Sequence, residues 1–215
     1  MDNTLLVSLS QQLAAYRSMD VIANNIANIN TPAYKRESVK FEEYVQQTQP
    51  AEGETGPQQI SFVQDKGTLR DLTQGSLNHT GAPFDLAISG KGYFTIKTAD
   101  GSTHYTRNGH FTLGANGNIA TEDGGKLQGD GGDLTVTNDD GDIHIAQDGT
   151  MTGARGQLGK VKLVSFADET ALQKEGSSLY STTQQPVAVE TPVLSQGDLE
   201  ESNVQPVLEI SHMLD

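Results

Sequence analysis

The sequence predicts an α+β fold: a long N-terminal helix paired with a C-terminal helix as a core domain, plus a predominantly antiparallel β domain. Two observations lead to this prediction. Apolar residues recur at spacings of three and four over the first 26 residues, which is the period of an amphipathic helix. From about residue 60 to 185, short alternating runs are followed by glycine-containing turns, which is typical of β-hairpins.

The N-terminal segment, residues 1–45, is predicted to be helical and then extended, with Thr31-Pro32 as the stop signal. A helix of about 27 residues would be about 40 Å long at 1.5 Å per residue, so its apolar stripe requires a long partner. We expect that partner to come from the C-terminus or from another chain. The stripe consists of Leu6, Leu9, Leu13, Tyr16, Met19, Ile22 or Ala23, and Ile26.

Residues 46–75 are predicted to form an extended linker. Their first part, 46–60, is rich in Pro, Gly, Gln and Glu and has little apolar surface to bury.

Residues 76–185 are predicted to form a β-rich outer domain. Each of three strand-like runs precedes Asp-Gly or Asn-Gly, the dipeptides that best tolerate positive φ in a hairpin turn. The runs are 94–97 before Asp100-Gly101, 111–113 before Asn116-Gly117, and 143–145 before Asp148-Gly149. A last strand and a short turn are expected from Val161, Leu163, Phe166 and Leu172.

Residues 186–215 are predicted to form a return segment and a short C-terminal helix. Ser202 lies three residues before Gln205, a capping-box pattern, and the apolar positions that follow it are Val204, Val207, Leu208 and Leu214. The expected helix of about 11 residues is too short to cover the N-terminal stripe alone.

The asparagines near the end of the N-terminal helix, Asn24, Asn25, Asn28 and Asn30, have two interpretations. Asparagine is a poor helix former because its side chain competes for backbone hydrogen bonds, so the cluster could simply end the helix. Alternatively, the amide groups of Asn24, Asn25 and Asn28 could bond to neighbouring helices and fix their register.

Composition and charge limit the class of protein. The net charge of −14 falls mainly after residue 45, which argues against a nucleic-acid partner because phosphate binding relies on clustered Lys and Arg. No apolar run exceeds four residues, so we expect no membrane insertion and no cleaved signal peptide. The absence of cysteine excludes a disulfide framework.

The sequence predicts no enzyme activity, no cofactor and no metal site. It has no Gly-x-Ser-x-Gly elbow and no Walker loop, and Gly90-Lys91-Gly92 reads as a tight turn between strands. His104 and His110 could approach each other across a hairpin but fit no close metal-ligand spacing. The acidic run 138–142 lacks the glycine and the glutamate of an EF-hand loop, although calcium binding at acidic turns stays open at this point.

Five motifs follow one another along the chain: SMDVIANNIANINTPAYKR at 18–36, and the segments 67–75, 80–94, 105–111 and 196–204. In content and order they resemble the motifs of the flagellar rod and hook proteins, an axial family of the bacterial basal body, and they are most similar to its proximal rod members. Ala33 stands where the family commonly has glycine. The chain stops at Asp215, where family members usually continue their terminal helix, so the C-terminal helix is expected to be short.

The resemblance implies a structural axial subunit of the flagellar basal-body rod that polymerises through its terminal helices and transmits torque from motor to hook. Its expected partners are itself and other rod proteins, with prior passage through the flagellar type III export apparatus into the periplasmic space. The residues expected at the assembly interface are Leu9, Leu13, Tyr16, Met19, Ile22, Asn24, Asn25, Ile26, Asn28, Val204, Val207 and Leu208.

The alternative is a secreted β-rich protein that binds carbohydrate, or adheres through calcium, with the N-terminal helix as a cap. A carbohydrate groove would need aromatic side chains, and the chain has no Trp, six Tyr and six Phe.

Overall fold

The computed structural model describes residues 2–48, 58–176 and 178–214. The chain divides into two compact units. The helical unit comprises Met1–Ile29, Lys35–Asp71 and Val204–Asp215, and the β domain comprises Asn30–Tyr34 and Leu72–Asn203. The two ends of the chain therefore build one unit and its middle builds the other, which confirms the predicted α+β class.

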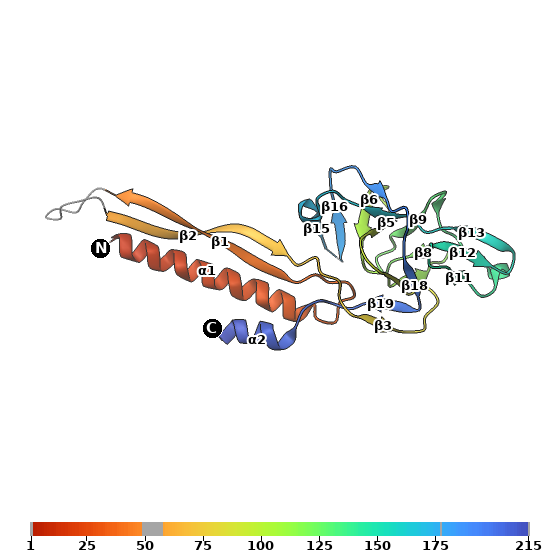
Figure 1. The fold of residues 1–215 in the computed structure, drawn as a ribbon, viewed down its shortest axis with the longest axis horizontal. Helices are drawn as coiled ribbons and strands as arrows, with labels where there is room; N and C mark the ends of the chain where they lie inside the picture. The colour runs from red at the N-terminus through yellow and green to blue at the C-terminus, as the bar shows by residue number, and fades with distance from the viewer. Residues whose placement is uncertain (1, 49–57, 177, 215) are drawn as a thin grey trace. The chain divides into compact units, whose positions relative to one another are not determined.

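The helical unit contains α1 (Asp2–Ala27), β1 (Glu37–Thr48), β2 (Gln58–Arg70) and α2 (Pro206–Leu214). The 26 residues of α1 agree with the predicted length. In Figure 1, α1 lies along the β1–β2 hairpin, and α2 packs beside the C-terminal part of α1. None of the described helices is long and apolar enough to cross a membrane.

The predicted linker at 46–75 is wrong for most of its length. β1 and β2 pair antiparallel from Glu37 opposite Arg70 to Thr48 opposite Gln58, with a register shift between Val39 and Phe41. Residues 58–70 therefore form a strand, while the Pro- and Gly-containing stretch 49–57 lies outside the described residues. Apolar residues at alternating positions on both sides of that stretch favour paired strands. The Pro, Gly, Gln and Glu content of residues 46–60 obscured this signal in the sequence.

The β domain is made of short strands, and every strand pair among its described residues is antiparallel. Two 3₁₀-helices, η1 (Asn138–Asp140) and η2 (Glu169–Ala171), interrupt them. The strands are β3 (Leu77–His79), β4 (Leu86–Ile88), β5 (Tyr93–Lys97), β6 (Thr103–Thr106), β7 (Thr112–Leu113), β8 (Ile119–Ala120), β9 (Lys126–Gly129), β10 (Gly132–Asp133), β11 (His144–Ile145), β12 (Thr150–Gly153), β13 (Gly156–Lys160), β14 (Leu163–Ser165), β15 (Gln173–Glu175), β16 (Leu179–Ser181), β17 (Val187–Ala188), β18 (Leu194–Gln196) and β19 (Asp198–Glu200).

The largest sheet has the order β15-β16-β6-β5-β9-β8-β7, with β10 beside β9 and β14 between β5 and β17. A second sheet has the order β11-β12-β13, and β4 and β3 pair with β18 and β19. The three predicted hairpins are confirmed as β5–β6, β7–β8 and β11–β12. Their turn glycines, Gly101, Gly117 and Gly149, all have positive φ, at 86°, 74° and 87°.

Two predictions for the later part of the chain need correction. The strand around Leu163 is not the last one, because β15 to β19 follow it and return the chain to β3 and β4. The C-terminal helix begins at Pro206 and has 9 residues, so Ser202 does not cap it. Proline suits the first helical position because its missing N–H would have no partner there.

The core of the β domain consists of two clusters. The larger is aliphatic around Phe94, which contacts Phe111 edge to face at 5.2 Å between ring centroids. The smaller is mostly aromatic and contains Tyr93, Tyr105, Val164, Phe166, Leu172 and Tyr180. The middle of the chain thus has its own buried core.

A buried ion pair joins β19 to the rest of the β domain. Arg107 Nε donates to Glu200 at 3.0 Å, and both side chains are buried. The same guanidinium donates to the carbonyls of Gly90 and Gly92 at 3.0 and 2.9 Å. Gly90-Lys91-Gly92 is therefore the turn between β4 and β5 that the sequence predicts, and Arg107 holds it in place.

Candidate assembly surface

The face of α1 that packs on its own chain is lined with small residues. Ser10, Ala14, Ser18, Val21 and Asn25 are buried or half-buried, and at 3.6 residues per turn they fall on one side of the helix. Two cavities mark this contact. One of about 290 Å³ adjoins Phe41 and Val63 of the hairpin, and one of about 280 Å³ adjoins Val39 and Glu209.

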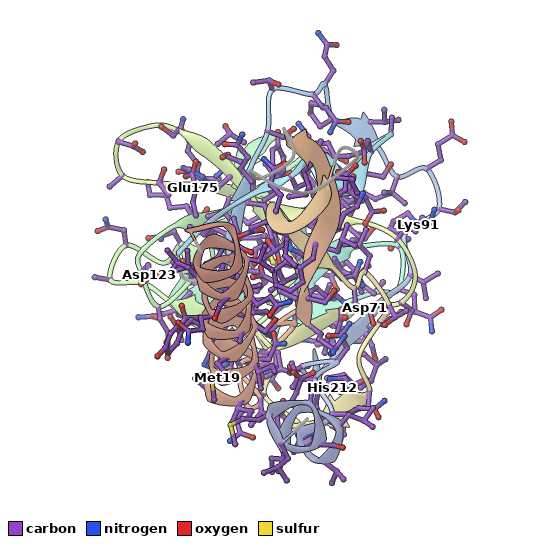
Figure 2. All side chains as sticks on the ribbon, turned by 90° about the vertical axis from the view of Figure 1, so that its left-hand side faces the viewer. Met19, Asp71, Lys91, Asp123, Glu175 and His212 are labelled. Atoms are coloured by element: carbon purple, nitrogen blue, oxygen red, sulfur yellow. The ribbon has the colours of Figure 1, made fainter. Side chains whose placement is uncertain are left out.

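Four residues of the predicted apolar stripe are exposed on the other side of α1, and one of them, Leu13, also adjoins the 290 Å³ cavity. Leu13 and Tyr16 are 61% and 67% exposed, and Leu9 and Met19 are about half exposed. In Figure 2, which looks nearly along α1, Met19 is labelled on the side away from the hairpin. Within the described part of the chain, these four apolar side chains therefore remain substantially exposed.

The other predicted interface residues divide between exposed and internal positions. Val207 and Leu208 of α2 are exposed, whereas Val204 is buried. Ile22 is half-buried and lines the 280 Å³ cavity, and Ile26 is also half-buried.

The asparagines at the end of α1 make hydrogen bonds within their own chain. Asn28 Nδ2 donates to the Asn24 carbonyl at 2.8 Å and so contributes to the end of α1. Asn25 is buried and bonds to another element: its amide donates to the Glu37 carbonyl at 2.8 Å and accepts from the Glu37 N–H at 3.0 Å. Asn25 therefore fixes α1 against the start of β1 within one chain.

A polar cluster with Asn25 and Glu209 buried at its centre joins α1, the residue just before β1, and α2. Asn25 Nδ2 also lies 3.2 Å from Glu209 Oε2, and the other carboxylate oxygen of Glu209 accepts from Arg36 Nε. Arg36 Nη2 lies 3.4 Å from His212 Nδ1. Asn25, Arg36, Glu209 and His212 together make up this polar cluster. Sequence reasoning missed Glu209, although an acidic residue amid the apolar residues of α2 is a readable signal.

The helical unit is short of buried apolar side chains and rich in exposed ones. Among its described side chains, the buried apolar residues are Val21 and Val204. Of the 16 large apolar side chains that are exposed in the described structure, 12 belong to the helical unit and 4 to the β domain. Large contiguous patches of exposed apolar side chains are typical of interaction sites.

Two histidines of the β domain that could have approached each other lie beside different carboxylates. His104 Nδ1 lies 3.3 Å from Glu175, and His110 Nδ1 lies 2.7 Å from Asp85, so the two histidines have separate partners. Within the described residues, no group of three His, Cys, Asp or Glu side chains could hold a metal. Burial raises the pKa of the Tyr93 hydroxyl. The Glu169 carboxylate, which accepts a hydrogen bond from that hydroxyl at 2.9 Å, raises the pKa further.

The middle of the chain forms a self-contained domain, and the two chain ends form a unit with many exposed apolar side chains. This arrangement is that of a structural subunit that assembles with other chains. The comparisons with known proteins agree with this class. The family model for flagella basal body rod protein matches residues 5–35, and that for the D1 domain of flagellar hook protein FlgE/F/G matches residues 87–153.

Three relatives cover most of the chain. The flagellar basal-body rod protein FlgF of Caulobacter vibrioides is 38% identical over 218 residues, which span 100% of this chain and 88% of that protein. FlgF of Mesorhizobium japonicum is 34% identical over 100% of this chain and 87% of its own length. FlgG of Bacillus subtilis is 36% identical over 91% of this chain and 83% of its own length. The chain belongs to the flagellar basal-body rod protein family, and it is a structural subunit of the rod.

Proposed function

We propose that this subunit polymerises through α1 and α2 and that the resulting rod transmits torque from the motor to the hook. The observation that supports this proposal is the outward-facing apolar stripe of α1, formed by Leu9, Leu13, Tyr16 and Met19, together with Val207 and Leu208 of α2. Ile22, Asn25 and Val204 support these helices from inside. Asn24, Ile26 and Asn28 stand at the end of α1, where a neighbouring helix can reach them.

The exposed side chains could supply enough free energy for association. Complete burial of one large apolar side chain contributes about 1.5–3 kcal/mol, so covering six of them would contribute on the order of 10 kcal/mol. That is comparable with the estimated entropic cost of association, about 4–15 kcal/mol. Because α1 and α2 differ, contacts between them in successive subunits would be heterologous, and such contacts build an open filament when the rotation between subunits does not close a ring.

The partners in this proposal are other copies of the chain and other rod proteins. We propose that the chain reaches the periplasmic space through the flagellar type III export apparatus, with no leader removed, and that its acidic surface disfavours nucleic acid. Intact-mass measurement of exported protein should place its N-terminus at or next to Met1. Loss of 15 to 30 residues would contradict this route.

Substituting the stripe tests polymerisation. Leu13→Asp places an unpaired carboxylate in a contact that loses water on assembly, at a cost of several kcal/mol per subunit. We expect the variant to be exported with a β-domain melting curve close to that of wild type, but basal bodies should lack a complete rod and cells should not swim.

The matched control is Leu113→Asp, since Leu113 is an exposed leucine on β7 of the β domain, outside the helical unit. Those cells should swim nearly as well as wild type. Normal motility of the Leu13→Asp cells would overturn the assignment of the stripe to assembly.

A further inference from the structure

α2 is turned the opposite way from an ordinary amphipathic helix. Such a helix buries its apolar side chains and leaves the charged ones in water. Here Glu209 is fully buried, whereas Val207 and Leu214, which lie on the other side of the helix, are 78% and 80% exposed. Leu208, Ile210 and Met213 are also exposed.

The contacts of α2 explain this orientation. One carboxylate oxygen of Glu209 lies 3.2 Å from the amide of Asn25 on α1, and the other accepts from the guanidinium of Arg36, just before β1. His212, one turn further along α2, lies next to the same guanidinium at 3.4 Å. Glu37 is the remaining charged residue that lines the 280 Å³ cavity, and its backbone carbonyl and N–H both form hydrogen bonds with the Asn25 side chain.

Apolar burial alone would favour a different orientation. Rotating α2 by about half a turn would place Val207 and Leu214 against α1 and return Glu209 to water, a gain in buried apolar area. That rotation would take Glu209 away from the buried Asn25 amide and the half-buried Arg36 guanidinium, and both would lose this acceptor, which costs free energy. A buried polar residue can thus select one helix orientation over a more apolar alternative.

We propose that Glu209 is a positioning residue that, through Asn25 and Arg36, fixes the rotation of α2 so that its apolar side chains face neighbouring subunits. This inference rests on the proposed assembly function, because it says why the apolar face of α2 is available to a partner. The fit depends on the length of the Glu209 side chain, which has to reach α1 and Arg36 with different oxygens.

Thiol labelling of the isolated chain tests the orientation, because the sequence has no cysteine of its own. A cysteine introduced by Val207→Cys should react rapidly with a maleimide. Adding Glu209→Leu should either slow that reaction about tenfold, as α2 turns over, or speed amide exchange of residues 206–214 about tenfold, as α2 leaves α1. Unchanged labelling together with unchanged exchange would overturn the proposal.

Two conservative variants separate positioning from charge. Glu209→Gln keeps the length and an acceptor oxygen, so labelling and exchange should stay within about threefold of wild type. Glu209→Asp keeps the charge but is one methylene shorter, and it should behave like Glu209→Leu. The reverse order would show that charge alone holds α2, and it would refute the positioning role.

The controls keep this test separate from that of the proposed function. Val207→Asp changes the outward face, so α2 exchange should stay as in wild type while rod assembly is lost. The β-domain melting curve should not move in any of these variants. If Leu13→Asp cells swim but the Glu209 variants behave as stated, the assembly proposal fails and the orientation of α2 stands.

Discussion

Ala33 stands at a position where the family motif commonly has glycine, and its backbone conformation is one that favours glycine. Its φ is +56°, in the left-handed region, and its side chain is 3% exposed. Its N–H donates to the Glu200 carbonyl at 2.7 Å, within the β domain. Alanine tolerates this conformation at a cost of about 1–2 kcal/mol, which glycine would avoid.

We therefore expect side-chain shape to decide stability at position 33. Ala33→Gly relieves the backbone but gives up a buried methyl group and adds freedom to the unfolded chain, so the free energy of unfolding should change by less than about 1 kcal/mol. Ala33→Val places a β-branched residue at positive φ and should cost more than about 2 kcal/mol. Urea denaturation measures both, and a valine variant as stable as wild type would show that the turn relaxes freely.

Asp140 links the stability of the β domain to pH. It is buried and accepts hydrogen bonds from the Thr137 N–H and hydroxyl, both at 2.7 Å, and from Arg155 at 2.9 Å. These donors, Thr137 first, hold the pKa of Asp140 below its ordinary value. At the β5–β6 turn, the Thr98 hydroxyl and Ser102 lower the pKa of Asp100 to about 2.

The sign of the pH dependence follows from these shifts. A carboxyl whose folded pKa is depressed stabilises the protein above its unfolded pKa of about 3.9, and that contribution is lost as pH falls towards the folded pKa. We expect the urea midpoint of the β domain to be flat from pH 7 to 5 and to fall between about pH 4 and 2. Asp140→Asn should lower the midpoint at pH 6 and flatten the fall, and an unchanged acid slope would contradict this account.

At the scale of elements, the turn between β4 and β5 and the return strand β19 depend on one guanidinium. Arg107 bonds to Glu200 and to two turn carbonyls, while the Gly75 N–H donates to the second oxygen of Glu200 at 3.1 Å. Because both charges are buried, the ion pair contributes to stability only if its hydrogen-bond geometry is good.

Removing one partner of this pair should be strongly destabilising. Arg107→Met leaves the buried Glu200 carboxylate without its guanidinium and should lower the free energy of unfolding of the β domain by about 3–5 kcal/mol. Lys91→Met, in the exposed part of the same turn, should change it by less than about 0.5 kcal/mol. Thermal melts of the two variants measure the difference, and equal melting temperatures would show that the ion pair is dispensable.

At the scale of the whole molecule, the two units differ in how much apolar surface they bury. The β domain has two clusters of buried residues, whereas the helical unit exposes most of its large apolar side chains. Local stability follows buried contacts, so the units should open with different free energies.

Hydrogen exchange of the isolated monomer should therefore be uneven. We expect slow exchange in β4, β5, β9 and β14 of the β domain. Exchange should be faster in the N-terminal part of α1, where Leu9 and Leu13 are exposed, than near Asn25, which is buried and bonds to Glu37 and Glu209, because a helix with few buried contacts frays. In assembled rods, α1 should become protected. Full protection of α1 in a proven monomer would mean that its contacts with the hairpin suffice, and would remove the need for a covering subunit.

The sequence by itself determined the class of fold, the length of α1, the three Asp-Gly and Asn-Gly hairpins and the family. These are local properties: the spacing of apolar residues fixes the period of a helix, and a dipeptide that tolerates positive φ fixes a turn. Leu9, Leu13 and Tyr16 could be placed on one face of a helix for the same reason.

The tertiary structure decided which face of α1 packs inward, that 58–70 pairs with β1, and that α2 buries Glu209. A periodic pattern shows that a helix has an apolar side, but not whether that side meets its own chain or another one. Ser10, Ala14 and Ser18 carry no apolar signal, yet their small size lets the hairpin approach. The partners of Glu209 lie 173 and 184 residues away in sequence, so contacts between distant segments, which no local pattern encodes, set its burial.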